Sequence, residues 1–148
     1  MDTRTVEQRS KNMSAIPHEN TKIEALVAKY LFAHGFRYRK NVKSLPGKPD
    51  IVLKKYRSVL FINGCFWHGH DGCSKAHLPK SNVEFWANKI DYNKRRDAEE
   101  HAKLREMGWN VITVWGCELG KALFNKTMEN VATRITDNIV GREGNGLE

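Results

Sequence analysis

The stretch Gly64-Cys65-Phe66-Trp67-His68-Gly69-His70-Asp71-Gly72-Cys73 decides which fold this sequence is expected to adopt. It contains two of the three cysteines, two of the six histidines and two adjacent large aromatic residues. The surrounding loop, residues 63–81, is too long to be idle in a compact domain unless something fixes it. So many metal-type ligands predict a loop that is held by a metal ion and that carries functional side chains.

The cysteines indicate a structural zinc site. Four potential ligands of one ion are present: Cys65, His70, Cys73 and Cys117. Three thiolates and one imidazole make a closed tetrahedral set without an open position for an activated water, so we expect zinc to act structurally. His68 or His77 could replace His70 as the fourth ligand. Three buried free thiols are the alternative to a metal site.

The composition is that of a basic globular protein. The 148 residues are 40% hydrophobic and 28% charged, with a net charge of +8, and they suffice for one domain with a real core. This charge favours a polyanionic partner, nucleic acid above all; a basic protein without such a partner is the alternative. Without a long apolar run or a signal peptide, we expect a cytoplasmic protein that does not span a membrane.

Periodicity predicts an α/β chain with a mixed sheet that is flanked by helices. Apolar residues at helical spacing follow Thr21, a suitable N-cap, and Gly35 ends that helix. Strand patterns occur at 36–41, 50–53, 59–62 and 109–115, and helical patterns at 82–107 and within 119–140. We expect a basic N-terminal arm over 1–20, a single domain over 21–140 and a flexible tail over 141–148.

Asp50 and His68 are the candidate catalytic pair. Asp50 begins a predicted strand, where a carboxylate suits a hard cation such as Mg²⁺ and hence phosphodiester hydrolysis; closing a turn after Pro49 is the simpler role. A histidine can take a proton from water at neutral pH, although His68 could also be a ligand or a solvated loop residue. Glu24 is either an outer acid of this cluster or a helix-capping charge.

Two adjacent aromatic residues, Phe66 and Trp67, lie in an irregular loop where both are hard to bury. Aromatic rings that stack on unpaired bases or wedge into base steps are a recurrent way to grip nucleic acid. Met13 on the basic arm could wedge from the other groove, and Trp86 could join the rings. Packing over the zinc site is the alternative, equally weighted for Trp67. It is favoured for two other rings, those of Phe85 and Trp115.

A mixed stripe runs along the predicted helix 82–107. Trp86, Lys89, Asn93 and Asp97 are three or four residues apart, so they share one face of the helix. This face is aromatic, basic and polar rather than apolar.

The chain resembles the very-short-patch repair endonucleases, bacterial enzymes that nick DNA beside the thymine of a thymine–guanine mismatch. The resemblance runs from about Arg9 to Cys117. It rests on an ordered series of segments: Arg9-Ser10-Lys11-Asn12-Met13, Leu45-Pro46-Gly47-Lys48-Pro49-Asp50, Gly64-Cys65-Phe66-Trp67-His68, Glu84-Phe85-Trp86 with Lys89-Ile90, and Gly108-Trp109 with Val114-Trp115. Such a series in order is highly specific.

This resemblance implies a restriction-endonuclease-like core with a structural zinc and a catalytic magnesium. Asp50 would bind the magnesium, His68 would be the general base or activate the phosphate, Glu24 would be an accessory acid, and the Ile62 carbonyl would stand near the metal. The implied zinc ligands are Cys65, His70, Cys73 and Cys117. The implied DNA contacts are Met13, Phe66, Trp67, Trp86, Lys89 and Asn93.

One position departs from the family pattern. Asn63 stands where the wider fold has a lysine and a known family member has a second catalytic histidine. Asparagine can orient a water or a phosphate oxygen but carries neither charge nor proton, which shifts more of the chemistry onto His68.

We therefore expect a magnesium-dependent, strand-specific endonuclease that acts as a monomer on duplex DNA with a thymine–guanine mismatch. Downstream repair proteins are further possible partners. Two alternatives stay open: a zinc-held module that binds distorted DNA without cutting it, and a restriction-type nuclease without mismatch preference.

Overall fold

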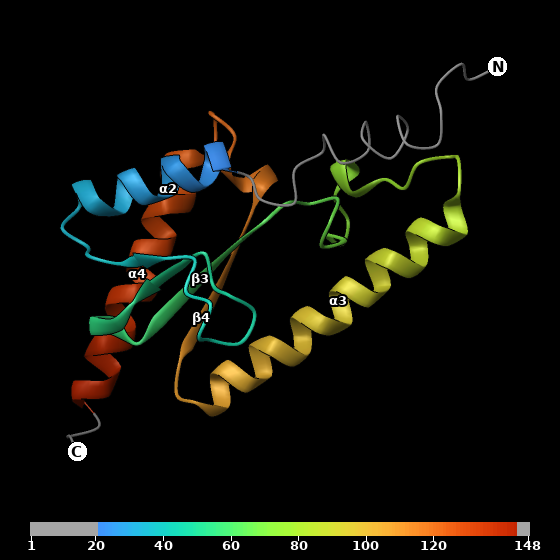
Figure 1. Cartoon of the computed structure of the whole chain (residues 1–148). Helices are drawn as coiled ribbons and strands as arrows, with labels where there is room; N and C mark the ends of the chain where they lie inside the picture. Colours follow the sequence, from blue (N-terminus) through green and yellow to red (C-terminus); the bar gives the residue numbers. More distant parts are fainter. Residues whose placement is uncertain (1–20, 145–148) are drawn as a thin grey trace.

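The computed structural model describes residues 21–144 (Figure 1). Met13 and the rest of the predicted basic arm therefore lie outside the described residues. The helices are α2 (Thr21–Ala33), α3 (Val83–Glu106) and α4 (Phe124–Gly144), with short 3-10 turns η1 (Lys54–Tyr56), η2 (Ser74–Ala76) and η3 (Gly116–Leu119). The strands are β1 (Arg39–Lys40), β2 (Ile51–Leu53), β3 (Ser58–Asn63) and β4 (Asn110–Trp115).

The strands form one mixed sheet in the order β1-β2-β3-β4. β1 and β3 run antiparallel to β2, whereas β3 and β4 are parallel, with Ser58 opposite Asn110 and Asn63 opposite Trp115. Parallel pairing brings the ends of β3 and β4 to the same edge. The segment 64–82 after β3, which we call the ligand loop, therefore starts beside η3, which follows β4.

Helices cover both faces of this sheet, with α2 and α4 on one side and α3 on the other (Figure 1). Successive side chains of a strand point to opposite faces. Leu60 and Ile62 of β3 accordingly join the core under α2 and α4, while Val59 and Phe61 join a second core with Leu104 of α3. Because both faces are covered, every residue of β3 is buried.

The predicted mixed α/β architecture is confirmed, and one of its strand boundaries is wrong. The strand predicted over 36–41 is reduced to Arg39–Lys40, because Phe36 packs into the core and Asn41 leaves the extended region with φ +52°. Helix α4 continues as far as Gly144, within the segment 141–148 that we expect to be a flexible tail. A glycine costs a helix only about 1 kcal/mol, and α4 is anchored by buried Met128 and Ile135.

None of the helices in the described part of the chain is long and apolar enough to cross a membrane.

Candidate active site and metal centre

Three thiols and one imidazole converge where the ligand loop meets η3. The potential ligand atoms of this cluster all lie within 4.8 Å of one another, and they belong to Cys65, His70, Cys73 and Cys117. The Cys117 Sγ to His70 Nδ1 distance is 3.4 Å. Tetrahedral bonds of the usual zinc lengths place sulfur and nitrogen about 3.5 Å apart. The donor set and its spacing therefore fit a metal ion, and His70 rather than His68 or His77 completes it.

The surroundings of the cluster shift the protonation of two of its thiols in opposite directions. Burial, together with the neighbouring thiols of Cys65 and Cys73, raises the pKa of Cys117 to about 12. The backbone N–H of Lys75 is the main cause that lowers the pKa of Cys73. A cation among these sulfurs would stabilise the thiolates that ligation requires. Trp115 stacks on His70 with ring centroids 4.1 Å apart, in the packing role expected for it.

A separate hollow of about 480 Å³, which we call the Asp50 hollow, lies beside the end of β3. The predicted residues among those lining it come from the start of β2, the end of β3 and the ligand loop: Asp50, Ile62, Asn63 and His68. The Ile62 N–H donates to Asp50 Oδ2 at 2.6 Å, which fixes the carboxylate against the strand. Ile62, Asn63 and His68 thus share one hollow with Asp50, although they follow it by 12 to 18 positions in the sequence.

Asp97 of α3 completes this hollow with an interaction that the sequence did not reveal. His68 Nδ1 lies 2.6 Å from Asp97 Oδ2, and each side chain is 19% exposed. An ionised carboxylate only accepts hydrogen bonds, so Nδ1 carries the proton and Nε2 is left as the basic nitrogen. Asp97 therefore fixes the tautomer of His68. The only sequence signal was the place of Asp97 on the polar stripe of its helix.

The polar stripe of α3 supports the ligand loop along its length. The Asn93 side-chain amide donates to the Trp67 carbonyl at 2.9 Å, and Asn93 is only 4% exposed. Gly69 has φ +60°, and a Cβ on it would lie 2.6 Å from Ile90 and 2.8 Å from Lys94. The helix thus approaches the loop too closely for a residue larger than glycine at position 69. Because α3 contacts both sequence neighbours of His68, Trp67 and Gly69, it holds His68 in place.

Four aromatic rings form a cluster where the start of α3 meets the ligand loop. Phe66, Trp67 and Trp86 lie edge to face, with centroids 5.1 to 5.8 Å apart. Trp67 is buried at 5% exposure, whereas Phe66 and Trp86 are half-buried. The packing expected for Phe85 is wrong: its ring is 60% exposed and touches the cluster only at Trp86, because its position on α3 points outward.

This chain is similar to known proteins over most of its length. A sequence profile described as "DNA mismatch endonuclease Vsr" matches residues 1–75. The "Type II nicking enzyme V.NmeAIP" of Neisseria meningitidis is 49% identical over 92% of this chain and 97% of its own length. The "DNA mismatch endonuclease Vsr" of Escherichia coli is 41% identical over 90% of this chain and 84% of its own length.

The chain belongs to the Vsr family of DNA mismatch endonucleases. A further relative, the "Type II nicking enzyme V.HpaIIP" of Haemophilus parainfluenzae, is 44% identical over 82% of this chain and 86% of its own length. These matches cover most of the chain, including the metal-ligand cluster and the Asp50 hollow.

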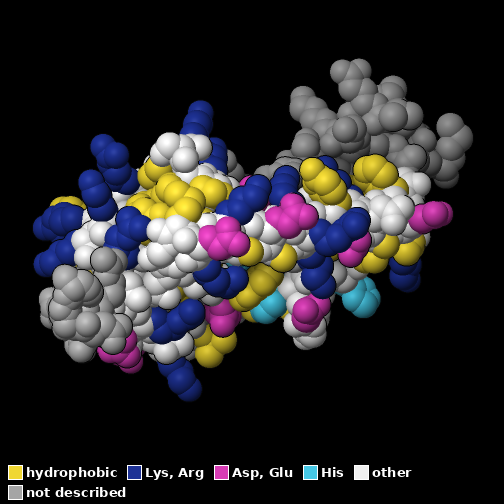
Figure 2. Space-filling view, turned by 90° about the horizontal axis from the view of Figure 1, so that it is seen from below, with side chains coloured by type: hydrophobic (Ala, Val, Ile, Leu, Met, Phe, Trp, Pro, Cys, Tyr) yellow, Lys and Arg dark blue, Asp and Glu magenta, His cyan; other side chains and the backbone are white. Residues whose placement is uncertain are grey.

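Two other residues implied by the Vsr resemblance, Glu24 and Lys89, lie outside the Asp50 hollow. Glu24 lies in the first turn of α2 at 5% exposure, and it is not among the described residues that line the Asp50 hollow. Lys89 is exposed on α3. Basic side chains spread over the molecular face shown in Figure 2, with acidic side chains between them, as the net charge of +8 suggests.

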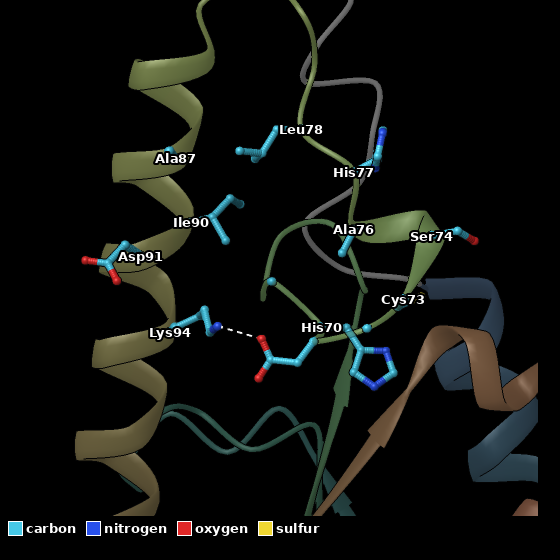
Figure 3. Close-up of a pocket in the computed structure, with 13 residues that line it drawn as sticks. His70, Cys73, Ser74, Ala76, His77, Leu78, Ala87, Ile90, Asp91 and Lys94 are labelled. Carbon is cyan, nitrogen blue, oxygen red and sulfur yellow. Dashed lines mark hydrogen bonds and ion pairs between the residues drawn. The ribbon is translucent and has the colours of Figure 1, made fainter.

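A second, shallower groove separates the ligand loop from α3 (Figure 3). Its volume is about 630 Å³, and Ala87, Ile90 and Leu78 form an apolar part of its wall. Lys94 donates to Asp71 at 2.9 Å across the groove, and this contact lowers the pKa of Asp71. This ion pair is a further contact between the ligand loop and α3, next to His70.

Proposed function

We propose that this member of the Vsr family is a magnesium-dependent endonuclease that nicks one strand beside the thymine of a thymine–guanine mismatch in very short patch repair. The main support is a single observation, that His68, held by Asp97 at 2.6 Å, shares a hollow with Asp50. The proposal includes a restriction-endonuclease-like fold and one catalytic domain over 21–140. The basic arm 1–20 and Met13 would contact the DNA, and the enzyme would act as a monomer ahead of other repair proteins.

The residues of the Asp50 hollow fit a magnesium ion. Mg²⁺ usually takes one or two protein carboxylates and completes its octahedron with water and phosphate oxygens. Asp50 would hold it together with the Ile62 carbonyl, which points to the same side of β3 as the N–H that Asp50 accepts. When bound, the ion would neutralise charge on the phosphate and make the attacking water more acidic.

His68 would act as the general base. With Nδ1 donating to Asp97, its Nε2 takes a proton from the water whose oxygen forms the new bond to phosphorus. The bond from phosphorus to one sugar oxygen breaks, and that oxygen leaves with a proton from solvent. Asp97 stabilises the imidazolium that forms, since the two groups make a short charge-assisted hydrogen bond. Asn63, 5% exposed and uncharged, would orient a water or a phosphate oxygen.

Zinc is the ion that suits the thiol and imidazole cluster. Cys65, His70, Cys73 and Cys117 would hold it in a closed tetrahedron, with no position left for catalysis. Its role would be to fix the first half of the ligand loop, residues 65–73, to η3 after β4, so that His68 keeps its place opposite Asp97. The buried ring of Trp67 supports the same loop from the α3 side.

The aromatic cluster would read the mismatch. Phe66 and Trp86 are half-exposed at its edge and would meet the bases first, with Trp67 behind them. Wedging between base steps costs unstacking energy, which is smaller at a mismatched pair and so favours it. Exposed Lys89 would contact a phosphate or a base edge. The Asn93 amide already donates a hydrogen bond to the Trp67 carbonyl, so its contribution to DNA binding would be to position the Trp67 ring.

The experiment compares two duplexes of one sequence, one with a thymine–guanine mismatch and one fully paired. With Mg²⁺ present, the wild-type chain is expected to nick only the mismatched duplex, and only in the thymine-containing strand. Asp50→Ala should abolish this nicking. Equal cutting of both duplexes refutes mismatch specificity, and cutting that survives Asp50→Ala refutes the assigned site. Tight binding without nicking under any divalent cation would make the protein a DNA-binding module.

A further inference from the structure

The Asp50 hollow contains positive charge that the proposed chemistry has not used. Three basic residues line it alongside its carboxylates: Lys43, Lys48 and Arg96. Arg96 Nε lies 3.7 Å from Glu100 Oε1, so part of its charge is directed to that carboxylate. Lys43 and Lys48 come from segment 41–49, which connects β1 to β2 and ends next to Asp50.

Lys48 has an unfavourable backbone conformation. Its φ of +49° lies in the left-handed region, which residues with a Cβ rarely adopt. Pro49 follows and is fully buried, and a residue before proline is restricted further. Glycine would fit position 48 without steric conflict. That a lysine stands there indicates that its side chain is used, as is common where strain occurs beside a functional site.

The surrounding contacts fix the backbone at Lys48. A Cβ on Gly47 would lie 3.1 Å from the Phe61 ring and 3.3 Å from Glu100, so this turn packs directly against β3 and α3. At the other end, the Asn41 N–H donates to the Asp50 carbonyl at 3.0 Å. The segment is thus held between the sheet and the helix, and Lys48 is presented at the hollow, two residues before Asp50.

We propose that Lys48 binds the DNA phosphate that is cut, an assignment that rests on the proposed function. The ammonium group contacts an oxygen of that phosphate and stabilises the charge that develops during attack by water. Asn63 supplies no charge at the end of β3. Lys48, from segment 41–49, would supply in the same hollow the positive charge that Asn63 lacks.

The first test measures binding, which requires no cleavage. The affinity of the full chain for the mismatched duplex is measured against salt concentration without added Mg²⁺. Loss of one phosphate contact reduces the slope of log K against log salt by about 0.9. Lys48→Met should show this reduction, whereas Lys54→Met should keep the wild-type slope, since Lys54 is exposed on η1 outside the hollow. A wild-type slope for Lys48→Met overturns the contact.

The second test assigns the contact to the phosphate that is cut. Lys48→Met should lower kcat for nicking by about 100-fold with a smaller change in KM, and Lys48→Arg should restore much of it. A reduced salt slope with wild-type kcat would overturn this assignment. If the wild-type chain nicks no mismatched duplex, the proposed function fails, but the salt slope still decides the phosphate contact.

A third variant separates a role in DNA binding from a role in folding. Lys48→Gly removes the side chain and the backbone strain together, and the relief of strain offsets the loss of the interaction that Lys48 makes within the protein. Its Tm should therefore stay close to that of the wild type while its salt slope and kcat match those of Lys48→Met. A Tm well below the wild-type value would show that Lys48 serves the fold, and it would overturn the inference drawn from the strain.

Discussion

Replacing Asp97 by asparagine tests whether the carboxylate beside His68 matters for the chemistry. The substitution keeps the size and shape of the side chain and removes its charge. The contact that it alters is short, 2.6 Å from Nδ1 to Oδ2, and both side chains are 19% exposed. Asparagine can still accept a hydrogen bond from Nδ1, so the tautomer of His68 can persist while the stabilisation of its charged form is lost.

The size of the effect follows from the charge separation. An imidazolium and a carboxylate with charge centres about 4 Å apart interact by about 4 kcal/mol at an effective dielectric constant of 20. Partial exposure and salt screening reduce this to about 2–3 kcal/mol. At 1.36 kcal/mol for each factor of ten, kcat for nicking should fall about 30- to 150-fold.

The assay is single-turnover nicking of the mismatched duplex with saturating Mg²⁺ over a range of pH. Asp91→Asn is the matched control, since Asp91 lies on the same helix, is paired with Arg95 at 3.0 Å and is largely exposed outside the Asp50 hollow. It should retain wild-type rates. A loss of less than threefold for Asp97→Asn, or an equal loss in the control, would refute the role of Asp97 as the partner of the base.

Three further outcomes are expected. Cys117→Ser should reduce bound zinc well below one ion per chain by elemental analysis and lower the Tm by about 10 °C; full zinc occupancy would contradict the ligand assignment. Trp67→Ala should cost about 3–5 kcal/mol in urea unfolding because the ring is buried, and Phe66→Ala less than half of that; equal losses would count against the burial argument. Burial lowers the pKa of His101, so below about pH 6.5 the unfolded chain binds more protons and stability falls. His101→Phe should lose less stability than the wild type between pH 7 and pH 5, and parallel curves would show that this group is not responsible.

Sequence reasoning succeeded where the signal is local. Ligand spacing in the loop identified Cys65, His70 and Cys73, because residue types with metal affinity are rare and were concentrated in one short stretch. The remaining cysteine, Cys117, was then expected to complete the set. Asp50 and His68 were recognised as chemically suited to one site, and the mixed sheet followed from the order of periodic segments. The end of the strand predicted over 36–41 could not be found in this way, since it depends on how Phe36 packs.

Exposure was less predictable than proximity. Adjacent Phe66 and Trp67 were expected to be hard to bury together, and Phe66 is indeed only half-buried. Which of the two would be buried was not predictable: Trp67 is 5% exposed because α3 lies directly over the loop at Gly69. Phe85 was expected to pack and is 60% exposed. One turn of a helix contains residues that point in opposite directions, and which of them meets the loop depends on the tertiary position of the helix.

By itself, the sequence determined the chemistry of this protein: a thiol-rich ligand set, a carboxylate with a histidine, aromatic rings and a basic charge. The tertiary structure decided how these groups come together, and it alone showed that Asp97 is the partner of His68. Parallel pairing of β3 with β4 brings Cys117 to the ligand loop, and the path of α3 brings Asp97 within 2.6 Å of His68, 29 residues away in sequence. Such pairings arise from packing between distant elements, and local patterns of residues do not encode them.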